Sequence, residues 1–485
     1  MIENSTLVLF GAKGNLSRVK LVPGLFHLDE SGQLPDDMKI LSVGRQASTQ
    51  EEWKLEIKGM LDEKFKGGYC KETYKRFIER NIYHANLTED PEAFQKFSEK
   101  LNEENLFSQN LAFFLSVRPS DFALIVDQLA DVGLLNQTKG WKRVLIEKPF
   151  GTNLKSAIEL QASISKHLNE DQIYRIDHYL GKSALQNILV TRFANSILEP
   201  IWNNLYIDHI QITNHEVLGV GDRTTFYEVT GALRDMIQSH LLQMMALTTM
   251  ERPKSFSPND IREEKIKLLE SIAPIGENDF ESHTFRAQYA QGEIKGEGNV
   301  DSYLSEVDNK DSITETYAAV KIFIETPRWK GVPIYLRTAK RLNESGTNIS
   351  VKFKNGDSII GDSNNWVVFN IQPNETTTIE LTTKTPSLNE GELRPTKLEG
   401  LNRIDGDESI DAYETLMLDL ISGNQSRFLH IDEVKAQWKF VDPIIDYWKK
   451  NKVKLNQYNS GSSDPESSKI IFEDPKQFWR KSIDN

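Results

Sequence analysis

Hydrophobic runs alternate with charged, helix-patterned segments over roughly the first third of the chain. The hydrophobic runs, which predict buried strands, cover 5–10, 39–44, 111–117 and 142–149. The charged segments, which predict helices, start at Ser17 and then cover 50–65, 71–80, 91–103 and 120–133. Strands that alternate with helices predict a parallel, doubly wound sheet. The pattern favours a dinucleotide-binding domain, although any α/β domain would also satisfy it.

The pattern changes after about residue 185. Helices are predicted over 184–198 and, mostly apolar, over 231–250. Between them, 207–217 is predicted to be a strand, in which Ile210 and Ile212 alternate with Gln211 and Thr213. Strand-like runs without intervening helices follow at 318–325, 333–338, 349–354, 366–372 and 377–384, and then helices at 410–422 and 432–449. This order predicts an α+β domain with a large, predominantly antiparallel sheet. The low-complexity stretch 459–469 is predicted to be a loop.

Composition narrows the class of protein. A chain of 485 residues is too long for one core, which predicts two or three domains. The net charge of −13 argues against general binding to nucleic acid or a membrane surface, so a phosphate ligand needs locally placed cations. The one cysteine, Cys70, excludes a disulfide framework and a cysteine metal site, and it fits a reducing cytoplasm. We predict no metal site, no membrane span and no signal peptide.

The first predicted strand runs into a glycine turn, in "LVLFGAKGNL". Gly11 and Gly14 allow the backbone to approach a pyrophosphate, which the following helix N-terminus attracts. The spacing is G-x-x-G-x-L, with Leu16 as the last position, and not G-x-G-x-x-G. A plain glycine turn explains the spacing equally well.

Two cations near this turn favour NADP as the coenzyme. Arg45, followed by Gln46, closes the second predicted strand, where NAD-binding proteins often carry an acid for the ribose 2′-hydroxyl. An arginine there suits a 2′-phosphate, and Lys13 adds a second positive charge. A solvated arginine is the alternative, because Arg45 lies further from the glycines than the usual ~20 residues. An arginine can also stack on adenine, so NAD stays open.

Charged and polar side chains concentrate in "QIYRIDHYLGKSALQ", residues 172–186, near the predicted domain junction. If a helix starts near His178, then Lys182 lies one turn further on, and both side chains can bind one phosphate. Asp177 is either a helix N-cap or the partner that orients a histidine from elsewhere. A lysine, Lys148, also ends the strand in "IEKPFG"; it is either a ligand-side cation or an exposed edge lysine.

The candidate histidine is His240, on the predicted helix 231–250. Its neighbours are apolar, so a structural core histidine is the simpler interpretation. Asp235 lies five positions away, which is about 140° around an α-helix. The spacing alone therefore does not place Asp235 and His240 on one face.

The motif "RIDHYLGK" resembles the signature of the glucose-6-phosphate dehydrogenase family. Other blocks resemble that family in the same order, from residue 6 to the tail near 478–481: "GAKGNLSRVKL", "EKPFG", "EVLGV", "GALRDMIQSHLLQ", "RWKGVP" and "IYLRTAKRL". The resemblance implies a Rossmann-type NADP-binding domain, residues 1–176, and an α+β substrate-binding and oligomerisation domain, residues 177–485. It also implies a homodimer or homotetramer in the cytoplasm.

The resemblance further implies oxidation of glucose 6-phosphate at C1 to 6-phosphogluconolactone with reduction of NADP, the first step of the pentose phosphate pathway. It gives His240 the role of general base and Asp177 that of its carboxylate partner. The implied substrate-binding residues are Lys20, Lys148, His178, Tyr179, Lys182, Glu216, Asp235 and Lys340. The implied coenzyme-binding residues are Gly11, Lys13, Gly14, Leu16, Arg45, Gln46, Lys148 and Pro149, whose peptide bond is cis in the family.

Several residues depart from the family pattern: Asn15, Ser183, Glu228, Ala339, Ser345 and Asp464. None removes a group that the chemistry needs, so an active dehydrogenase is the first hypothesis. A non-catalytic paralogue that binds NADP or a sugar phosphate is the second. A dehydrogenase for another sugar is the third, although intact phosphate-binding residues argue against an unphosphorylated one.

Overall fold

The computed structural model describes residues 2–85, 91–103, 106–355, 364–386, 393–402, 410–450 and 455–480. The chain forms two compact units, and it passes between them several times. The first unit contains Met1–Lys182, Ser255–Arg262 and Ser409–Lys435, and the second contains the remaining segments. The boundary after residue 176, between a coenzyme-binding and a substrate-binding domain, remains a proposal. No helix in the described part of the chain is long and apolar enough to cross a membrane.

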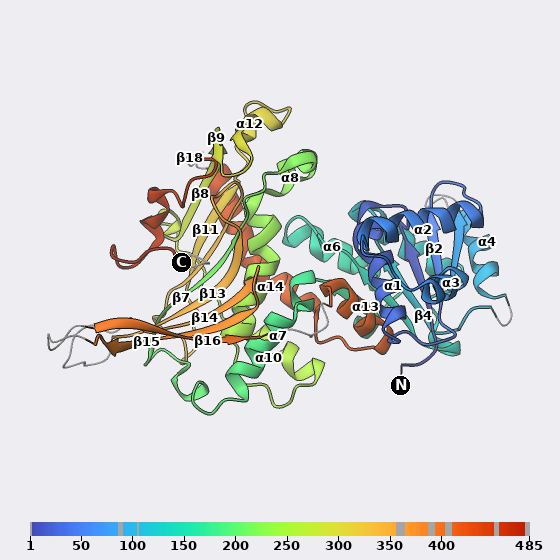
Figure 1. The fold of residues 1–485 in the computed structure, drawn as a ribbon, viewed down its shortest axis with the longest axis horizontal. Helices are drawn as coiled ribbons and strands as arrows, with labels where there is room; N and C mark the ends of the chain where they lie inside the picture. Colours follow the sequence, from blue (N-terminus) through green and yellow to red (C-terminus); the bar gives the residue numbers. More distant parts are fainter. Residues whose placement is uncertain are drawn as a thin grey trace. The chain divides into compact units, whose positions relative to one another are not determined.

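A seven-stranded sheet with the order β17-β6-β5-β4-β1-β2-β3 forms the centre of the first unit (Figure 1). Its strands are β1 (Thr6–Phe10), β2 (Lys39–Gly44), β3 (Asn81–Ala85), β4 (Leu111–Leu115), β5 (Lys142–Ile146), β6 (Ile173–Ile176) and β17 (Phe428–Leu429). All neighbours pair in parallel except β17, which is antiparallel to β6. The predicted parallel sheet is therefore confirmed, and β3, β6 and β17 are strands that the sequence analysis missed.

Helices cover both faces of this sheet, which explains why its strands are almost wholly apolar. Leu7 and Leu9 of β1 belong to one core cluster with residues of α1, α2, α3 and α13. Phe10, with the opposite orientation, packs on Phe94 and Phe97 of α4. The helices of this unit are α1 (Val22–Glu30), α2 (Gln50–Lys64), α3 (Lys71–Arg80), α4 (Pro91–Leu101), α5 (Phe122–Asp131), α6 (Leu154–Ile164) and α13 (Ala412–Ser422).

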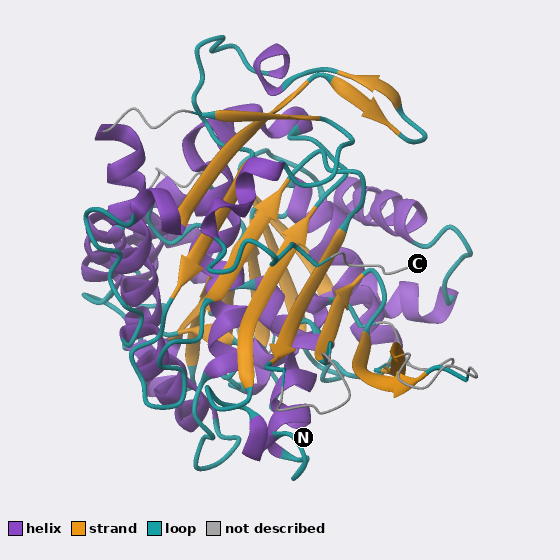
Figure 2. Cartoon of the chain, turned by 90° about the vertical axis from the view of Figure 1, so that its left-hand side faces the viewer, coloured by secondary structure: helices purple, strands orange, loops and turns teal. Residues whose placement is uncertain are grey.

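The second unit contains a nine-stranded sheet with the order β16-β15-β14-β13-β7-β12-β11-β8-β18, whose strands run side by side in Figure 2. The strands are β7 (Ile207–His215), β8 (Thr284–Ala290), β11 (Tyr317–Ile322), β12 (Ile334–Ala339), β13 (Gly346–Phe353), β14 (Trp366–Gln372), β15 (Thr376–Lys384), β16 (Leu393–Leu401) and β18 (Asn456–Asn459). Only β12 with β7 and β18 with β8 pair in parallel. The prediction of a predominantly antiparallel sheet is confirmed.

The predicted helix 231–250 is a series of three geometries. The helix α8 (Thr224–Ala232) is kinked at Gly231, η8 (Leu233–Leu241) is a π-helix, and α9 (Leu242–Thr249) is again α-helical. The π-helix η8 packs against β7, β11 and β12. Further helices with residues in this unit are α7 (Ser183–Phe193), α10 (Pro258–Glu270) and α14 (Ile431–Lys450).

The C-terminal tail covers the polar side of β7. The Gln211 side chain donates to the carbonyl of Phe478 and accepts from the amide of Arg480, both at 2.9 Å. Trp479 packs on Tyr335, and the Arg480 guanidinium forms a buried ion pair with Glu380. Both sides of β7 are therefore buried, including the side that carries Gln211 and Thr213. The end of the predicted loop 459–469 belongs to a 3₁₀-helix, Glu466–Ile471.

We expect the Trp479 side chain to stabilise the second unit by holding this tail. Trp479 is 6% exposed, whereas its neighbour Phe478 is 54% exposed. Trp479→Ala should lower the free energy of unfolding by about 3–5 kcal/mol because it leaves a cavity in an aromatic cluster. Phe478→Ala is the matched control and should change it by less than about 0.5 kcal/mol. Denaturant unfolding of both variants checks this, and equal losses would contradict it.

Candidate active site

A cavity of about 730 Å³ opens at the carboxyl ends of β1, β2 and β4. Parallel strands end at the same edge of a sheet, so the turns after these three neighbouring strands meet there. The residues that line it include Gly11, Lys13, Gly14, Arg45, Gln46 and Arg118. The sequence analysis predicted five of these six residues as coenzyme-binding. Leu16, Lys148 and Pro149 are not among the described residues that line the cavity.

Gly11 is required by the geometry of the turn. Its φ is +80°, and a Cβ atom there would lie 2.0 Å from the carbonyl oxygen of Ser116. The amide of Gly14 donates to the carbonyl of Gly11 at 2.8 Å, which closes the turn before the π-helix η1 (Ser17–Leu21). The glycines therefore let two turns approach closely. A phosphate group of a ligand can then contact the backbone of the glycine turn.

The cations of the cavity differ in how they are held. The Lys13 Nζ lies 2.6 Å from Glu56, so its charge is already paired. Arg45 is exposed and has no ion-pair partner among the described residues. Arg118, which the sequence analysis missed, pairs with Asp121 at 3.3 Å and keeps 66% of its side chain exposed. Arg45 is therefore the cation that is most available to a ligand phosphate.

The end of β5 brings a buried carboxylic acid next to Lys148. The Glu147 side chain is buried, and its Oε2 accepts from the amide of Lys148 at 3.3 Å. Burial raises the pKa of Glu147 to about 7. The Lys148–Pro149 peptide bond is cis, as the family resemblance implied. A neutral acid is therefore the favoured form of Glu147 below about pH 7.

The segment after β6 differs from the predicted helix start. Asp177 is fully buried and caps a 3₁₀-helix, η5 (His178–Gly181), through a 3.0 Å bond from the amide of Tyr179. The α-helix α7 begins only at Ser183. The prediction that His178 and Lys182 lie one α-helical turn apart is therefore wrong. The aspartate cap favours the tight turn, in which i→i+3 hydrogen bonds form.

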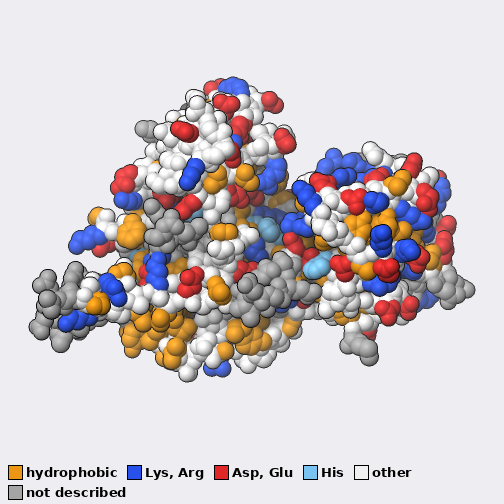
Figure 3. Space-filling model, viewed as in Figure 1, with side chains coloured by type: hydrophobic (Ala, Val, Ile, Leu, Met, Phe, Trp, Pro, Cys, Tyr) orange, Lys and Arg blue, Asp and Glu red, His pale blue; other side chains and the backbone are white. Residues whose placement is uncertain are grey.

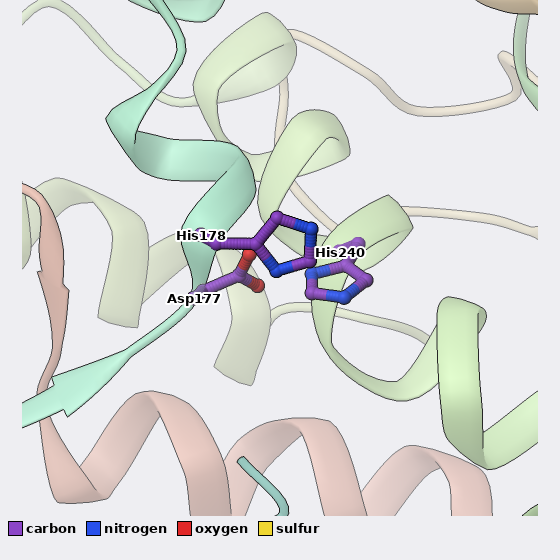
Figure 4. A group of neighbouring side chains, drawn as sticks. All are labelled: Asp177, His178 and His240. Carbon is purple, nitrogen blue, oxygen red and sulfur yellow. The ribbon is translucent and has the colours of Figure 1, made fainter. Parts of the chain in front are cut away.

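The side chains of this segment lie close to one another. Figure 4 shows Asp177 and His178 extending from the end of β6. The His178 ring contacts the Tyr179 ring, with 4.9 Å between their centroids. The Lys182 Nζ lies 3.7 Å from the centroid of the Tyr179 ring. An imidazole, a phenol and an ammonium group therefore share one small region of the first unit.

Lys20, also in the first unit, is placed by a residue far along the chain. It lies in η1, and its Nζ is 2.6 Å from the carboxylate of Asp411. Asp411 is the N-cap of α13. No local pattern predicts this pair, because 391 residues of sequence separate its members.

In the second unit, the parallel pairing of β7 with β12 brings two predicted residues together. Glu216 follows β7 and Lys340 follows β12, and their side chains form an ion pair. The Lys340 Nζ also lies 5.6 Å from the centroid of the Tyr227 ring. Burial, followed by the charge of Asp235, raises the pKa of Tyr227 well above its usual value. These groups form a polar cluster at the carboxyl ends of β7 and β12.

The π-helix changes the relation between Asp235 and His240. Both lie in η8, whose i→i+5 hydrogen bonds place residues five apart one above the other. The 140° separation that an α-helix predicts therefore does not apply, and the two side chains share a face of the helix. His240, which Figure 4 shows on this helix, is only 2% exposed.

Five of the six departures from the family pattern, all except Asn15, lie in the second unit. Glu228 accepts hydrogen bonds from Tyr303 and Ser312, and Asp464 pairs with Arg337. Ser183 donates to Glu375 at 2.8 Å, and Ser345 accepts from the amide of Val217 at 2.8 Å. Ala339 is an ordinary residue of β12, opposite His215. These substitutions are thus accommodated by the fold of this unit.

Comparisons with known proteins agree over almost the whole chain. A family model described as glucose-6-phosphate dehydrogenase, NAD binding domain, matches residues 8–187, and one described as the C-terminal domain matches 189–480. The chain is 39% identical to glucose-6-phosphate 1-dehydrogenase of Bacillus subtilis, over 98% of both chains.

Two solved structures are similar over 99% of both chains. One, glucose-6-phosphate dehydrogenase in complex with its substrate glucose-6-phosphate, has a TM-score of 0.90 and 32% identity. The other, glucose-6-phosphate 1-dehydrogenase from Mycobacterium avium, has a TM-score of 0.85 and 28% identity.

We expect Glu147 to make the stability of the protein depend on pH. Its pKa is about 7 in the fold, against 4.5 for an ordinary glutamate, so the native state binds more protons than the unfolded state between these values. Stability therefore falls as pH rises through this range, by about 3 kcal/mol for this group. Glu147→Gln removes the titration, so its free energy of unfolding relative to wild type should rise between pH 5 and 8.

Urea unfolding at a series of pH values measures this difference. Glu79→Gln, which removes an exposed carboxylate of the same unit, is the control and should follow wild type. A constant difference between Glu147→Gln and wild type would show that Glu147 does not titrate in this range.

Proposed function

Because the chain belongs to the glucose-6-phosphate dehydrogenase family, we propose that it oxidises glucose 6-phosphate at C1 to 6-phosphogluconolactone, with NADP as the coenzyme. The full-length match supports the activity, and it is the observation that carries the proposal. The presence of every titratable side chain that the chemistry needs, Asp177 and His240 above all, is consistent with it. The reaction is the first step of the pentose phosphate pathway.

His240 is the proposed general base. The C1 hydroxyl must lose its proton as the C1 hydride leaves, which forms the carbonyl of the lactone. A neutral imidazole accepts that proton at working pH, since an ordinary histidine has a pKa near 6.5. Burial of His240 limits the access of water to the imidazole. Asp177 is the proposed carboxylate that stabilises the protonated imidazole, a role in which a buried acid is effective.

The remaining polar residues are proposed to bind the substrate. His178, Tyr179 and Lys182 supply donors for the dianionic phosphate, which needs cationic partners. Acceptors for the sugar hydroxyls are supplied by Glu216 and Asp235. The further proposed substrate contacts are Lys20, Lys148 and Lys340. Lys20 and Lys340 have carboxylate neighbours and Lys182 has an aromatic neighbour in its own unit, which limits the number of rotamers that these side chains adopt.

NADP, when bound, accepts the hydride. The cavity at the glycine turn suits its pyrophosphate, because Gly11 and Gly14 line it with backbone and bring no side chain between the turn and a ligand. Arg45 fits its 2′-phosphate, because its guanidinium has no ion-pair partner in the described part of the chain. We thus propose that the protein prefers NADP over NAD, because the Arg45 guanidinium is available to bind the 2′-phosphate.

A homodimer or homotetramer in the cytoplasm completes the proposal. Hydrophobic side chains gather along the lowest border of the second unit in Figure 3. The exposed apolar side chains of this unit include Ile197, Leu205, Leu398 and Leu401. Apolar surface of this kind is commonly covered by another subunit. The one cysteine of the chain fits a reducing compartment.

Replacing the proposed base should abolish turnover and preserve binding. His240→Asn should lower kcat by about 10²–10⁴-fold, the usual contribution of a general base. His167→Asn, at a half-exposed histidine paired with Asp127, is the matched control and should keep wild-type kcat. Absorbance of reduced nicotinamide measures turnover, and quenching of tryptophan fluorescence measures coenzyme binding. A wild-type protein that binds NADP and produces no NADPH would refute the proposed activity.

Replacing Arg45 should distinguish the two coenzymes. Arg45→Ala should raise KM for NADP by about 10–100-fold, because it removes charge-assisted hydrogen bonds to the 2′-phosphate. KM for NAD, which lacks that phosphate, should change by less than threefold. Steady-state kinetics with each coenzyme measures this. An equal rise for both coenzymes would indicate that Arg45 stacks on adenine.

A further inference from the structure

The first turn of α13 lies against two segments of the proposed substrate site, η1 and η5, and against α1, although more than 220 residues of sequence separate it from them. Asp411 pairs with Lys20 of η1. Glu414 lies 2.9 Å from His27 of α1. At η5, a Cβ atom on Gly181 would lie 2.6 Å from the carbonyl oxygen of Ala412, so the backbones of η5 and α13 are in close contact. This turn thus fixes the relative positions of η1, α1 and η5.

Tyr413 contacts His178 directly. The two rings are parallel within 6°, and their centroids are 6.1 Å apart. Tyr179 meets the same imidazole at an angle of 61°, with its centroid 4.9 Å away. An imidazole that contacts two aromatic rings in different orientations has fewer accessible rotamers than a solvated one. Its nitrogen atoms are therefore presented in a defined direction.

Tyr413 interacts electrostatically with Glu147. The Glu147 carboxyl group is buried at the end of β5, and its charge acts on the Tyr413 hydroxyl. The other contact of this carboxyl group is the amide of Lys148. The acid is thus held at the end of the strand, beside a phenol whose ring is stacked on the imidazole. Burial, followed by the charge of Glu147, raises the pKa of Tyr413, so the hydroxyl keeps its proton and remains a donor.

We propose that Tyr413 is a positioning residue, whose ring orients the His178 imidazole for the phosphate of the substrate and whose hydroxyl lies in the field of the buried Glu147 carboxyl group. The inference rests on the proposed function of His178 and goes beyond it, because Tyr413 and Glu147 are assigned roles through contacts that only the fold creates. Neither residue is proposed to touch the substrate.

The test compares two substitutions of Tyr413 in the full-length enzyme. Tyr413→Leu removes the stacked ring and should raise KM for glucose 6-phosphate about tenfold, with kcat within threefold of wild type. Tyr413→Phe keeps the ring and removes only the hydroxyl near Glu147, so it should raise KM by no more than about threefold. KM for NADP should not change in either variant. Leu420→Val, in the buried part of the same helix, controls for loss of stability and should keep wild-type KM.

A double-mutant cycle shows whether Tyr413 acts through His178. In a His178→Asn background, Tyr413→Leu should cause no further rise in KM if the imidazole transmits its effect. An equal rise in both backgrounds would overturn the proposal. So would a Tyr413→Leu variant with wild-type KM, or one in which the KM values for both substrates rise together with a fall in kcat.

The ring signal of His178 in NMR spectra provides a test that needs no turnover. His178→Asn identifies the signal, and Tyr413→Leu should shift it because the ring current of the phenol is lost. An unchanged signal would refute the stacking. If the wild-type protein neither binds nor oxidises glucose 6-phosphate, the proposed function fails, whereas the contact between Tyr413 and His178 is still confirmed or refuted by this spectrum.

Discussion

Parallel pairing of neighbouring strands is the constraint on which both sets of functional residues depend. In the first unit, β4, β1 and β2 run in one direction, so the glycine turn, Arg45 and Arg118 emerge at one edge. The strands can be parallel because helices cover both faces of the sheet. The apolar side chains of the strands are buried against these helices. The coenzyme cavity is a direct consequence of that topology.

The second unit uses the same constraint within an otherwise antiparallel sheet. The one parallel pair among its central strands, β7 with β12, brings Glu216 beside Lys340. An antiparallel pair would have placed these two residues at opposite ends of the sheet. The C-terminal tail covers the polar side of the same strands, through Gln211, Trp479 and Arg480. The tail therefore stabilises the strands from which the polar cluster extends.

Local helix geometry and distant segments refine both arrangements. The π-helix η8 places Asp235 and His240 on one face, which a regular α-helix would not do. In the first unit, the initial turn of α13 contacts Lys20, His178 and Glu147, which come from three different elements. Lys20 and His178 are thus supported by Asp411 and Tyr413, which have no part in the proposed chemistry.

The sequence by itself determined the class of each sheet, the glycine turn and the identity of almost all the candidate side chains. Hydrophobic periodicity and strand–helix order depend on neighbouring residues, and so they are readable along the chain. The family motif around His178 is likewise a local pattern.

Only the tertiary structure decided which of these side chains are already paired and what holds them. Local alternatives of similar free energy exist for three of these features. They are the pairing of Lys13 with Glu56, the 3₁₀ turn after Asp177 and the π-helix around His240. The contact of Tyr413 with His178 joins residues 235 positions apart, and its only determinant is the packing of α13 on the sheet. Long-range packing of this kind leaves no periodic signal in a single sequence, because the partners share no local pattern.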